Sequence, residues 1–180
     1  MRRAVPLLLA ASAFALGSCP GRLARDAASS DGPASDVTLS YPPGPYGPYL
    51  TNTIANFAFP TASGSVSLEQ WYTPRASVPR LLVLRVMAAW SGPSQFAAAH
   101  TARLRALAPD RTTFVDILVL GRDNRPATLD ELASWRARYD ALPDVLAIDP
   151  EYRIDPRTLG APQLPGVVFV DPRTMTIVIR

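Results

Sequence analysis

The sequence predicts an α/β domain in which helices flank a central mixed sheet. Two apolar runs, residues 80–89 and 112–120, have the composition of strands that are buried on both faces. Helical patterns follow them at residues 95–107 and 128–142, so crossover helices should make the first two strands parallel. Two short apolar runs within residues 167–179, separated by a turn, predict an antiparallel hairpin. Parallel strands and a hairpin in one sheet make that sheet mixed.

A second hairpin is expected before this sheet, as an N-terminal extension. Residues 54–59 and 66–68 have strand-like patterns and are separated by a turn. One helical turn should follow at residues 68–72. Residues 145–148 predict a further short strand, and the prolines that come after it indicate a loop.

Side-chain spacing and a capping signal place the two helices. The first helix should pack through one face, which carries Phe96, His100, Leu104 and Leu107. Thr128 and Glu131 match a capping box, in which each side chain satisfies a free amide at the helix start. The second helix should bury Leu129, Leu132, Trp135 and Tyr139.

The N-terminus has the pattern of a bacterial lipoprotein precursor. Two arginines precede an apolar run at residues 4–16, which is too short to span a bilayer and predicts a signal peptide at residues 1–18. Leu16-Gly17-Ser18-Cys19 resembles a lipobox, so Cys19 is expected to be acylated and to anchor the chain to a membrane. The alternative is an ordinary signal peptide with a cysteine nearby by chance. The lipoprotein interpretation predicts export to the bacterial envelope, on the periplasmic side or at the cell surface.

Residues 19–52 are expected to form a lipid-anchored tether before a folded domain at residues 53–180. Residues 20–40 contain too few large apolar side chains to bury a core. Residues 41–49 differ because they combine prolines with three tyrosines. We favour docking of these rings on the chain's own domain, and the alternative is a segment that binds a partner.

Charge and cysteine content exclude several functions. All 18 basic residues are arginine and the net charge is +3, but after Arg2 and Arg3 the arginines are scattered singly. Nucleic-acid binding usually requires a clustered basic patch, so no nucleic-acid partner is expected. Cys19 is the only cysteine, so no disulfide can form within the chain.

A turn between the first buried strand and its helix carries the most specific signal. Trp90-Ser91-Gly92-Pro93-Ser94 resembles Trp-Cys-Gly-Pro-Cys, the active-site turn of the thioredoxin-like disulfide oxidoreductases, with serine at both cysteine positions. Leu164-Pro165 and the strand after it resemble the cis-proline loop of that family. The N-terminal hairpin is similar to that of the membrane-tethered, redoxin-type branch. The resemblance spans residues 53–180 and implies a thioredoxin-like fold, in which the C-terminal helix of the family is expected to be missing.

The resemblance also implies that the turn has lost the chemistry of the family. There, a first cysteine activated at a helix N-terminus forms a mixed disulfide, which the second cysteine resolves. Ser91 and Ser94 neither ionise near neutral pH nor form a disulfide. Arg85 stands where thioredoxins place a buried acid, so that proton acceptor should be absent too. The degenerate active-site positions, none of them expected to be catalytic, are Trp90, Ser91, Gly92, Pro93, Ser94 and Pro165.

No cofactor and no metal site is predicted from the remaining residues. His100 is the only histidine, and it lies about 240° around the helix axis from Ser94, which disfavours Ser–His catalysis. One group of acids lacks the alternating ligand spacing of a calcium loop and is expected to be solvated: Asp144, Asp149, Glu151 and Asp155.

Three functions are consistent with these residues. The first is a redox-inactive thioredoxin-like lipoprotein that binds an envelope protein or peptide through the groove beside the turn. The second is a thiol-disulfide oxidoreductase whose cysteines were lost or engineered to serine. The third is a purely structural envelope lipoprotein. The missing cysteines favour a protein without enzymatic activity.

Overall fold

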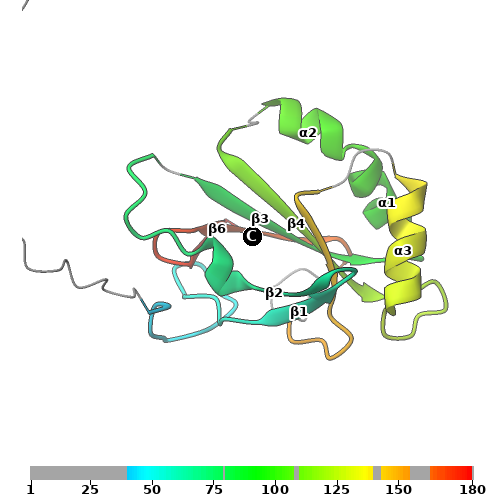
Figure 1. Cartoon of the computed structure of the whole chain (residues 1–180), viewed down its shortest axis with the longest axis horizontal. Coiled ribbons are helices and arrows are strands. Elements are labelled where there is room, and N and C mark those ends of the chain that lie inside the picture. The colour runs from blue at the N-terminus through cyan, green and yellow to red at the C-terminus, as the bar shows by residue number, and fades with distance from the viewer. Residues whose placement is uncertain (1–39, 79, 108–109, 140–142, 155–162, 180) are drawn as a thin grey trace, which may run out of the picture. The chain divides into compact units, whose positions relative to one another are not determined.

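A five-stranded mixed sheet forms the centre of the structure, a computed structural model that describes residues 40–78, 80–107, 110–139, 143–154 and 163–179 (Figure 1). The strands lie in the order β5 (Val145–Ile148), β4 (Thr112–Leu120), β3 (Leu81–Ala88), β6 (Gly166–Asp171) and β7 (Thr176–Ile179). The pairs β3–β4 and β4–β5 are parallel, whereas β3–β6 and β6–β7 are antiparallel. The predicted mixed sheet is therefore confirmed. The predicted signal peptide, Cys19 and residues 20–39 lie outside the described residues.

Strand β3 is the central strand, as its apolar composition predicts. Seven of its eight residues are buried, because neighbouring strands pair with both edges and other elements cover both faces. Arg85 lies opposite Asp116 of β4 and opposite Val167 of β6. This register brings two charged residues together in the buried centre of the sheet.

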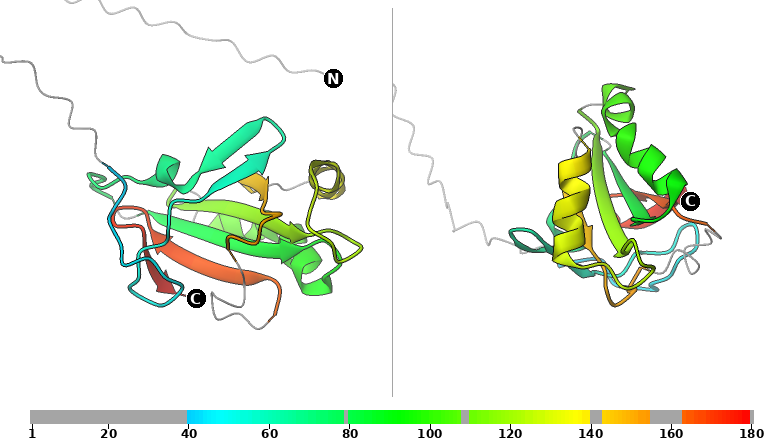
Figure 2. Two further views of the ribbon diagram at one scale, coloured as in Figure 1. Left: turned by 90° about the horizontal axis from the view of Figure 1, so that it is seen from below. Right: turned by 90° about the vertical axis from the view of Figure 1, so that its right-hand side faces the viewer.

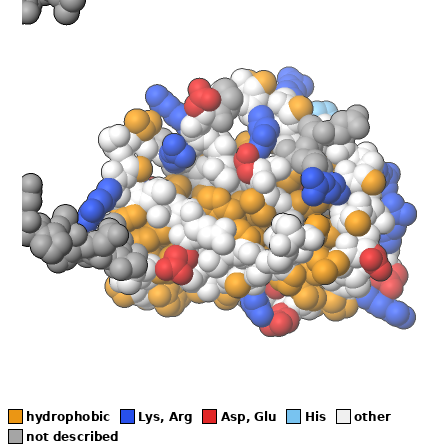
Figure 3. Space-filling model, viewed as in Figure 1, with side chains coloured by type: hydrophobic (Ala, Val, Ile, Leu, Met, Phe, Trp, Pro, Cys, Tyr) orange, Lys and Arg blue, Asp and Glu red, His pale blue; other side chains and the backbone are white. Residues whose placement is uncertain are grey.

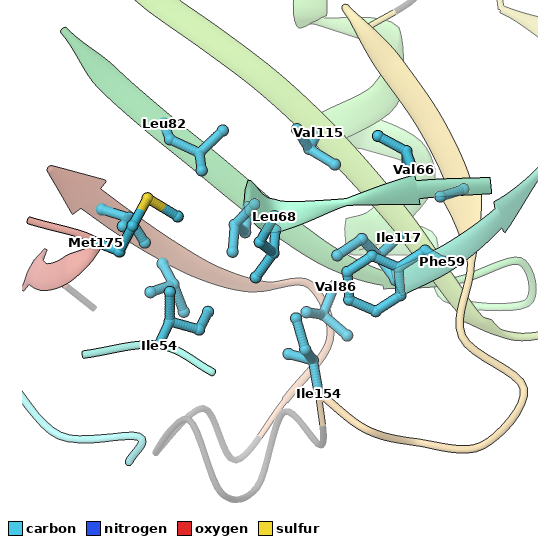
Figure 4. Close-up of a cluster of buried hydrophobic side chains, with 14 of the residues drawn as sticks. Ile54, Phe59, Val66, Leu68, Leu82, Val86, Val115, Ile117, Ile154 and Met175 are labelled. Atoms are coloured by element: carbon cyan, nitrogen blue, oxygen red, sulfur yellow. The ribbon is translucent and has the colours of Figure 1, made fainter. Parts of the chain in front are cut away.

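The N-terminal hairpin covers one face of the sheet. It consists of β1 (Ala58–Thr61) and β2 (Gly64–Ser67), and the 3-10 turn η1 (Leu68–Trp71) follows directly. Phe59, Val66 and Leu68 point from these elements into the main hydrophobic core, where they meet side chains of β3, β4 and β6 (Figure 4). The predicted hairpin and helical turn are confirmed, although the first strand begins four residues later than expected.

Helices α1 (Gly92–Ala99) and α2 (Thr101–Leu107) follow β3 and cover the face that carries Arg85. The hairpin and α1 thus lie on opposite sides of the sheet (Figure 2). Helix α3 (Leu129–Arg138) connects β4 to β5 and joins Leu132 and Trp135 to a second, smaller core. The predicted capping box is present, since Thr128 Oγ1 accepts from the Glu131 amide at 3.3 Å and Glu131 Oε2 accepts from the Thr128 amide at 2.9 Å.

The predicted packing face of the first helix is wrong. One continuous helix was expected over residues 95–107, but the structure ends α1 at Ala99 and begins α2 at Thr101. The buried positions are Ser94, Ala98 and Thr101, and the expected apolar stripe faces outward. The buried face thus consists of small and polar side chains, and apolar spacing alone does not detect such a face. In α3, Leu129 was expected to be buried but is 48% exposed.

The segment before the hairpin contacts the domain, although residues up to 52 were assigned to the tether. The Thr51 amide donates to the Ile177 carbonyl at 2.9 Å, and the Ile177 amide donates to the Asn52 carbonyl at 3.0 Å, which covers the outer edge of β7. The Tyr41 hydroxyl donates to the Ile54 carbonyl at 2.8 Å, and its ring lies 5.8 Å from that of Tyr72. Docking on the domain therefore holds for Tyr41, whereas the rings of Tyr46 and Tyr49 are exposed.

None of the helices in the described part of the chain has the length and hydropathy that crossing a bilayer requires.

Candidate functional site

The turn at residues 90–94 connects the end of β3 to the first turn of α1. The Ser91 amide donates to the Ala88 carbonyl at 3.1 Å, and the Ser91 carbonyl accepts from the Gln95 amide at 3.0 Å. Pro93 lies in the first turn of the helix, where its missing amide hydrogen costs nothing. Backbone bonds on both sides therefore hold the turn in one position.

Ser91 caps helix α1 and also joins the turn to a distant loop. Its hydroxyl oxygen accepts from the Ser94 amide at 3.3 Å, which satisfies one of the free amides at the helix start. The same hydroxyl donates to the Leu164 carbonyl at 3.1 Å, immediately before the cis Leu164-Pro165 peptide bond. The Ser91 residue is only 4% exposed. Its side chain is thus engaged as both donor and acceptor within the protein.

Ser94 is completely buried beneath the turn. Its hydroxyl oxygen accepts a hydrogen bond of 3.3 Å from the Ala88 amide at the end of β3. This bond connects the helix to the strand at the point where the register of β3 with β4 becomes irregular. The hydroxyl groups of both serines are therefore hydrogen-bonded within the protein.

The outer surface of the turn is apolar and accessible. Trp90 is 50% exposed, and Gly92 and Pro93 are also exposed. Leu164 and Pro165 are half-buried beside Ser91, to which Leu164 is hydrogen-bonded. We call these five residues the turn surface. The structure thus brings together Trp90 to Ser94 and Pro165, the positions that the sequence singled out.

A buried ion pair lies under the two helices that follow the turn. Arg85 Nε donates to Asp116 Oδ1 at 2.6 Å, and Arg85 Nη2 donates to Asp116 Oδ2 at 2.8 Å. The other guanidinium contacts are the Ala97 carbonyl at 3.0 Å and the Thr101 hydroxyl at 2.7 Å. Burial raises the pKa of the Asp116 carboxyl to about 6, while the charge and hydrogen bonds of Arg85 oppose the rise.

A buried acid lies beside Arg85 on the neighbouring strand, a contact that the sequence analysis did not predict. Asp116 of β4 lies opposite Arg85, and their residues are 1% and 2% exposed. The sequence contained a signal for this pair, because each of the two buried strands carries one charged residue and the charges are opposite.

Solved structures with the same arrangement of strands and helices decide the fold. A putative thiol:disulfide interchange protein DsbE from Chlorobium tepidum has a TM-score of 0.56 and 19% identity, covering 73% of this chain and 83% of that one. The thioredoxin domain of a thiol-disulfide oxidoreductase from Bacteroides vulgatus has a TM-score of 0.55 and 11% identity, covering 72% and 86%. The fold is thioredoxin-like.

A third similar structure is an exposed lipoprotein thioredoxin, Etrx1, from Streptococcus pneumoniae. Its TM-score is 0.53 and its identity 19%, covering 69% of this chain and 87% of that one. No protein-family model and no curated protein sequence matches the chain. At these identities the comparisons establish the thioredoxin-like fold alone.

This thioredoxin-like turn provides a helix N-terminus but no ionisable nucleophile. Free amides and the helix dipole can stabilise a negative charge at position 91, but a serine hydroxyl does not ionise near neutral pH. The hydrogen bond of His100 lies elsewhere, because its Nδ1 is 2.9 Å from the Phe96 carbonyl oxygen. Its ring stacks on that of Phe96 with a centroid distance of 4.0 Å. The turn thus keeps the helix N-terminus of a thioredoxin-like site, with serine hydroxyls at both cysteine positions.

The expectation that the acidic loop residues are solvated is wrong for Asp149, which is only 1% exposed. Asp149 Oδ2 accepts from the Ile154 amide at 2.8 Å, and Asp144 Oδ2 accepts from the Phe114 amide at 2.8 Å. Glu151 pairs with Arg153 at 2.7 Å, and Asp155 lies outside the described residues. Within the described ranges, no group of three or more His, Cys, Asp or Glu residues is placed to hold a metal ion.

Proposed function

We propose that this chain is a redox-inactive thioredoxin-like envelope lipoprotein, which binds a protein or peptide through the turn surface. The observation that carries the proposal is the double engagement of Ser91. Its hydroxyl caps α1 and bonds to the Leu164 carbonyl, so the turn keeps its geometry without a cysteine. A pre-formed surface of this kind loses little conformational entropy when a partner binds.

The absence of redox chemistry follows from the residue inventory. Disulfide exchange requires a thiolate that attacks a disulfide sulfur, and the only cysteine in the chain is Cys19. If Cys19 is acylated as the lipobox predicts, its sulfur is not available for exchange. Neither serine hydroxyl can take over this step.

The exposed tryptophan supports binding at the turn surface. Trp90 leaves half of its surface in water, although it follows Ala88 and Ala89, which are buried. Half-exposed tryptophans on a rigid support are frequent energetic centres of protein interfaces. The proposal is also supported by the resemblance to the thioredoxin-like family, whose members are expected to bind extended peptides beside this turn.

The envelope location rests on the lipobox at Leu16-Gly17-Ser18-Cys19. An exposed lipoprotein thioredoxin from Streptococcus pneumoniae has a similar fold, which shows that this fold is compatible with a lipid anchor. Labelling of the expressed protein with an alkyne fatty acid tests the anchor. The label should be present in the natural chain and absent from Cys19→Ser.

The binding proposal is tested by quantitative pull-down from envelope extracts. Trp90→Ala should remove the specific partner, because it deletes the largest exposed group of the turn surface. Tyr46→Ala is the matched control, since it deletes an exposed aromatic ring outside this surface. A partner set that is the same for Trp90→Ala and the natural chain would leave a purely structural role as the better explanation.

A second candidate is a thiol-disulfide oxidoreductase whose cysteines were replaced by serine. The position of Ser91 at the N-terminus of α1 favours it, because a cysteine there would have a lowered pKa. The double variant Ser91→Cys/Ser94→Cys should then reduce insulin disulfides, with Ser91→Cys alone as the control. No activity in the double variant would show that restoring the two thiols is not sufficient for disulfide reduction, and would count against this candidate.

A further inference from the structure

Helices α1 and α2 carry an apolar stripe that is exposed in the described part of the domain. Phe96 is 66% exposed, Leu104 40% and Leu107 77%, and His100 stacks on Phe96 between them. The chain continues from α1 to α2 with helical bonds, since the His100 amide donates to the Phe96 carbonyl and the Leu104 amide to the His100 carbonyl, both at 3.2 Å. The four side chains therefore lie along one side of a nearly continuous helical segment. We call them the α1–α2 stripe.

Helix α2 is short and buries little of its surface against the domain. It has seven residues, of which Thr101 alone is buried. Ala102, Arg103, Leu104, Ala106 and Leu107 are all exposed. So short a helix is marginal in water unless an apolar face is buried. An external apolar surface would bury Leu104 and Leu107.

The two helices that carry the stripe have basic but no acidic residues, although the exposed Asp110 follows α2. Residues 92–107 contain no Asp or Glu, whereas they contain Arg103 and Arg105. Arg103 is exposed, and Arg105 forms an ion pair with Asp144. Hydrophobic, basic and some acidic side chains lie near one another in the part of the surface where α2 runs (Figure 3). The exposed Leu129 of α3 differs, because Asp130 and Glu131 follow it directly.

We propose that the α1–α2 stripe rests on an anionic lipid bilayer, with Phe96, Leu104 and Leu107 at the boundary of the acyl chains. Exposed apolar residues beside arginines, on helices that carry no acid of their own, are typical of helices that lie in the membrane interface. The arginine stems can lie along the apolar region while the guanidinium groups reach lipid phosphates. The contact belongs to the folded domain itself, and it does not depend on the lipid anchor or on what the turn surface binds.

A fluorophore placed on the stripe tests the contact directly. The full chain with Cys19→Ser, which cannot be acylated, carries an environment-sensitive label at Leu107→Cys. Vesicles of phosphatidylcholine with 30% phosphatidylglycerol should shift its emission to the blue by about 10 nm or more, as expected for burial in the interface. Pure phosphatidylcholine vesicles should give a clearly smaller shift.

Leu129→Cys in the same Cys19→Ser chain is the matched control, since Leu129 is 48% exposed on another helix. The label there should not respond, even if the apolar N-terminal segment brings the chain to the vesicles. Arg103→Ser should reduce the response at position 107 at least several-fold, with circular dichroism confirming the fold. Equal responses at 107 and 129, or none at 107, would overturn the proposal.

Discussion

At the scale of single residues, the most consequential contact is the buried pair of Arg85 and Asp116. The carboxylate receives two hydrogen bonds from the guanidinium, which also bonds to the Ala97 carbonyl and the Thr101 hydroxyl. This contact thus joins four elements at one point under the turn: β3, β4, α1 and α2. The cost of removing both charges from water offsets much of their attraction, so the pair as a whole adds little net stability. Loss of one partner, however, leaves the other charge buried and unpaired, which strongly destabilises the fold.

A double-mutant cycle should reveal this dependence. Arg85→Met leaves the Asp116 carboxylate buried without its partner and should lower the free energy of unfolding by about 3–5 kcal/mol. Arg85→Met/Asp116→Leu should recover most of that loss, because no buried charge remains. Urea unfolding at pH 7 measures both.

Arg125→Met, which breaks the exposed pair with Asp123, should change stability by less than about 1 kcal/mol. Additive effects of the two core substitutions would contradict this account.

The pH dependence of stability follows from the raised pKa of Asp116, about 6 in the folded protein against 3.8 ordinarily. The folded state holds the proton more tightly than the unfolded state, so this contribution is fully present below pH 3.8 and is lost as the pH rises through about 6. Between these values the unfolding free energy of the natural chain should fall relative to Asp116→Asn. Urea titrations at several pH values check it. Parallel curves for the two proteins would show that Asp116 does not titrate there.

At the scale of elements, the starts of the helices control how the turn is held. Helix α3 begins with a capping box that uses only local residues, Thr128 and Glu131. Helix α1 begins with Ser91, whose hydroxyl caps the helix and reaches Leu164. The two caps therefore resemble each other locally, but only that of α1 connects separate parts of the domain.

Removing each cap should separate these roles. Ser91→Ala should lower the free energy of unfolding by about 1–2 kcal/mol, because the cap and the bond to Leu164 are both lost. It should also speed hydrogen exchange of the Ser94 amide, which that hydroxyl protects. Thr128→Ala should cost about 1 kcal/mol and leave exchange at Ser94 unchanged. Unaltered exchange in Ser91→Ala would mean that the hydroxyl does not hold the turn.

The elements differ in how far the sequence predicted them. Strands β3 and β4 and the capping box were predicted because their signals lie within a few neighbouring residues. The buried face of α1 was not predicted from the sequence. Its residues, Ser94, Ala98 and Thr101, do not form an apolar pattern that differs from the rest of the helix. Their burial depends on Arg85 and the sheet, which the helix meets only in the folded protein.

At the scale of the whole molecule, the segment before the hairpin closes the domain. Thr51 and Asn52 exchange backbone hydrogen bonds with Ile177, so the edge strand β7 does not offer a free edge there to another chain. Tyr41 fastens the start of this segment through its hydroxyl bond to Ile54, and burial raises the pKa of that hydroxyl. The domain thus includes residues well before the first hairpin strand.

Tyr41→Ala should therefore destabilise the whole domain. The loss of the ring packing against Tyr72 and of the hydrogen bond should cost about 1–3 kcal/mol, seen as a lower thermal midpoint. Tyr46→Ala removes an exposed ring of the same segment and should leave the midpoint nearly unchanged. Equal midpoints for Tyr41→Ala and the natural chain would show that the segment adds nothing to stability.

The sequence by itself determined the order of strands and helices, the thioredoxin-like turn with two serines, and the lack of any disulfide within the chain. These features depend on local spacing or on residue counts. Only the tertiary structure decided that Arg85 pairs with Asp116 across 31 positions, that Ser91 bonds to Leu164 across 73, and that the α1–α2 stripe faces outward. The physical reason is that burial and partner choice depend on which surfaces meet after folding, and residues far apart in the chain supply those surfaces.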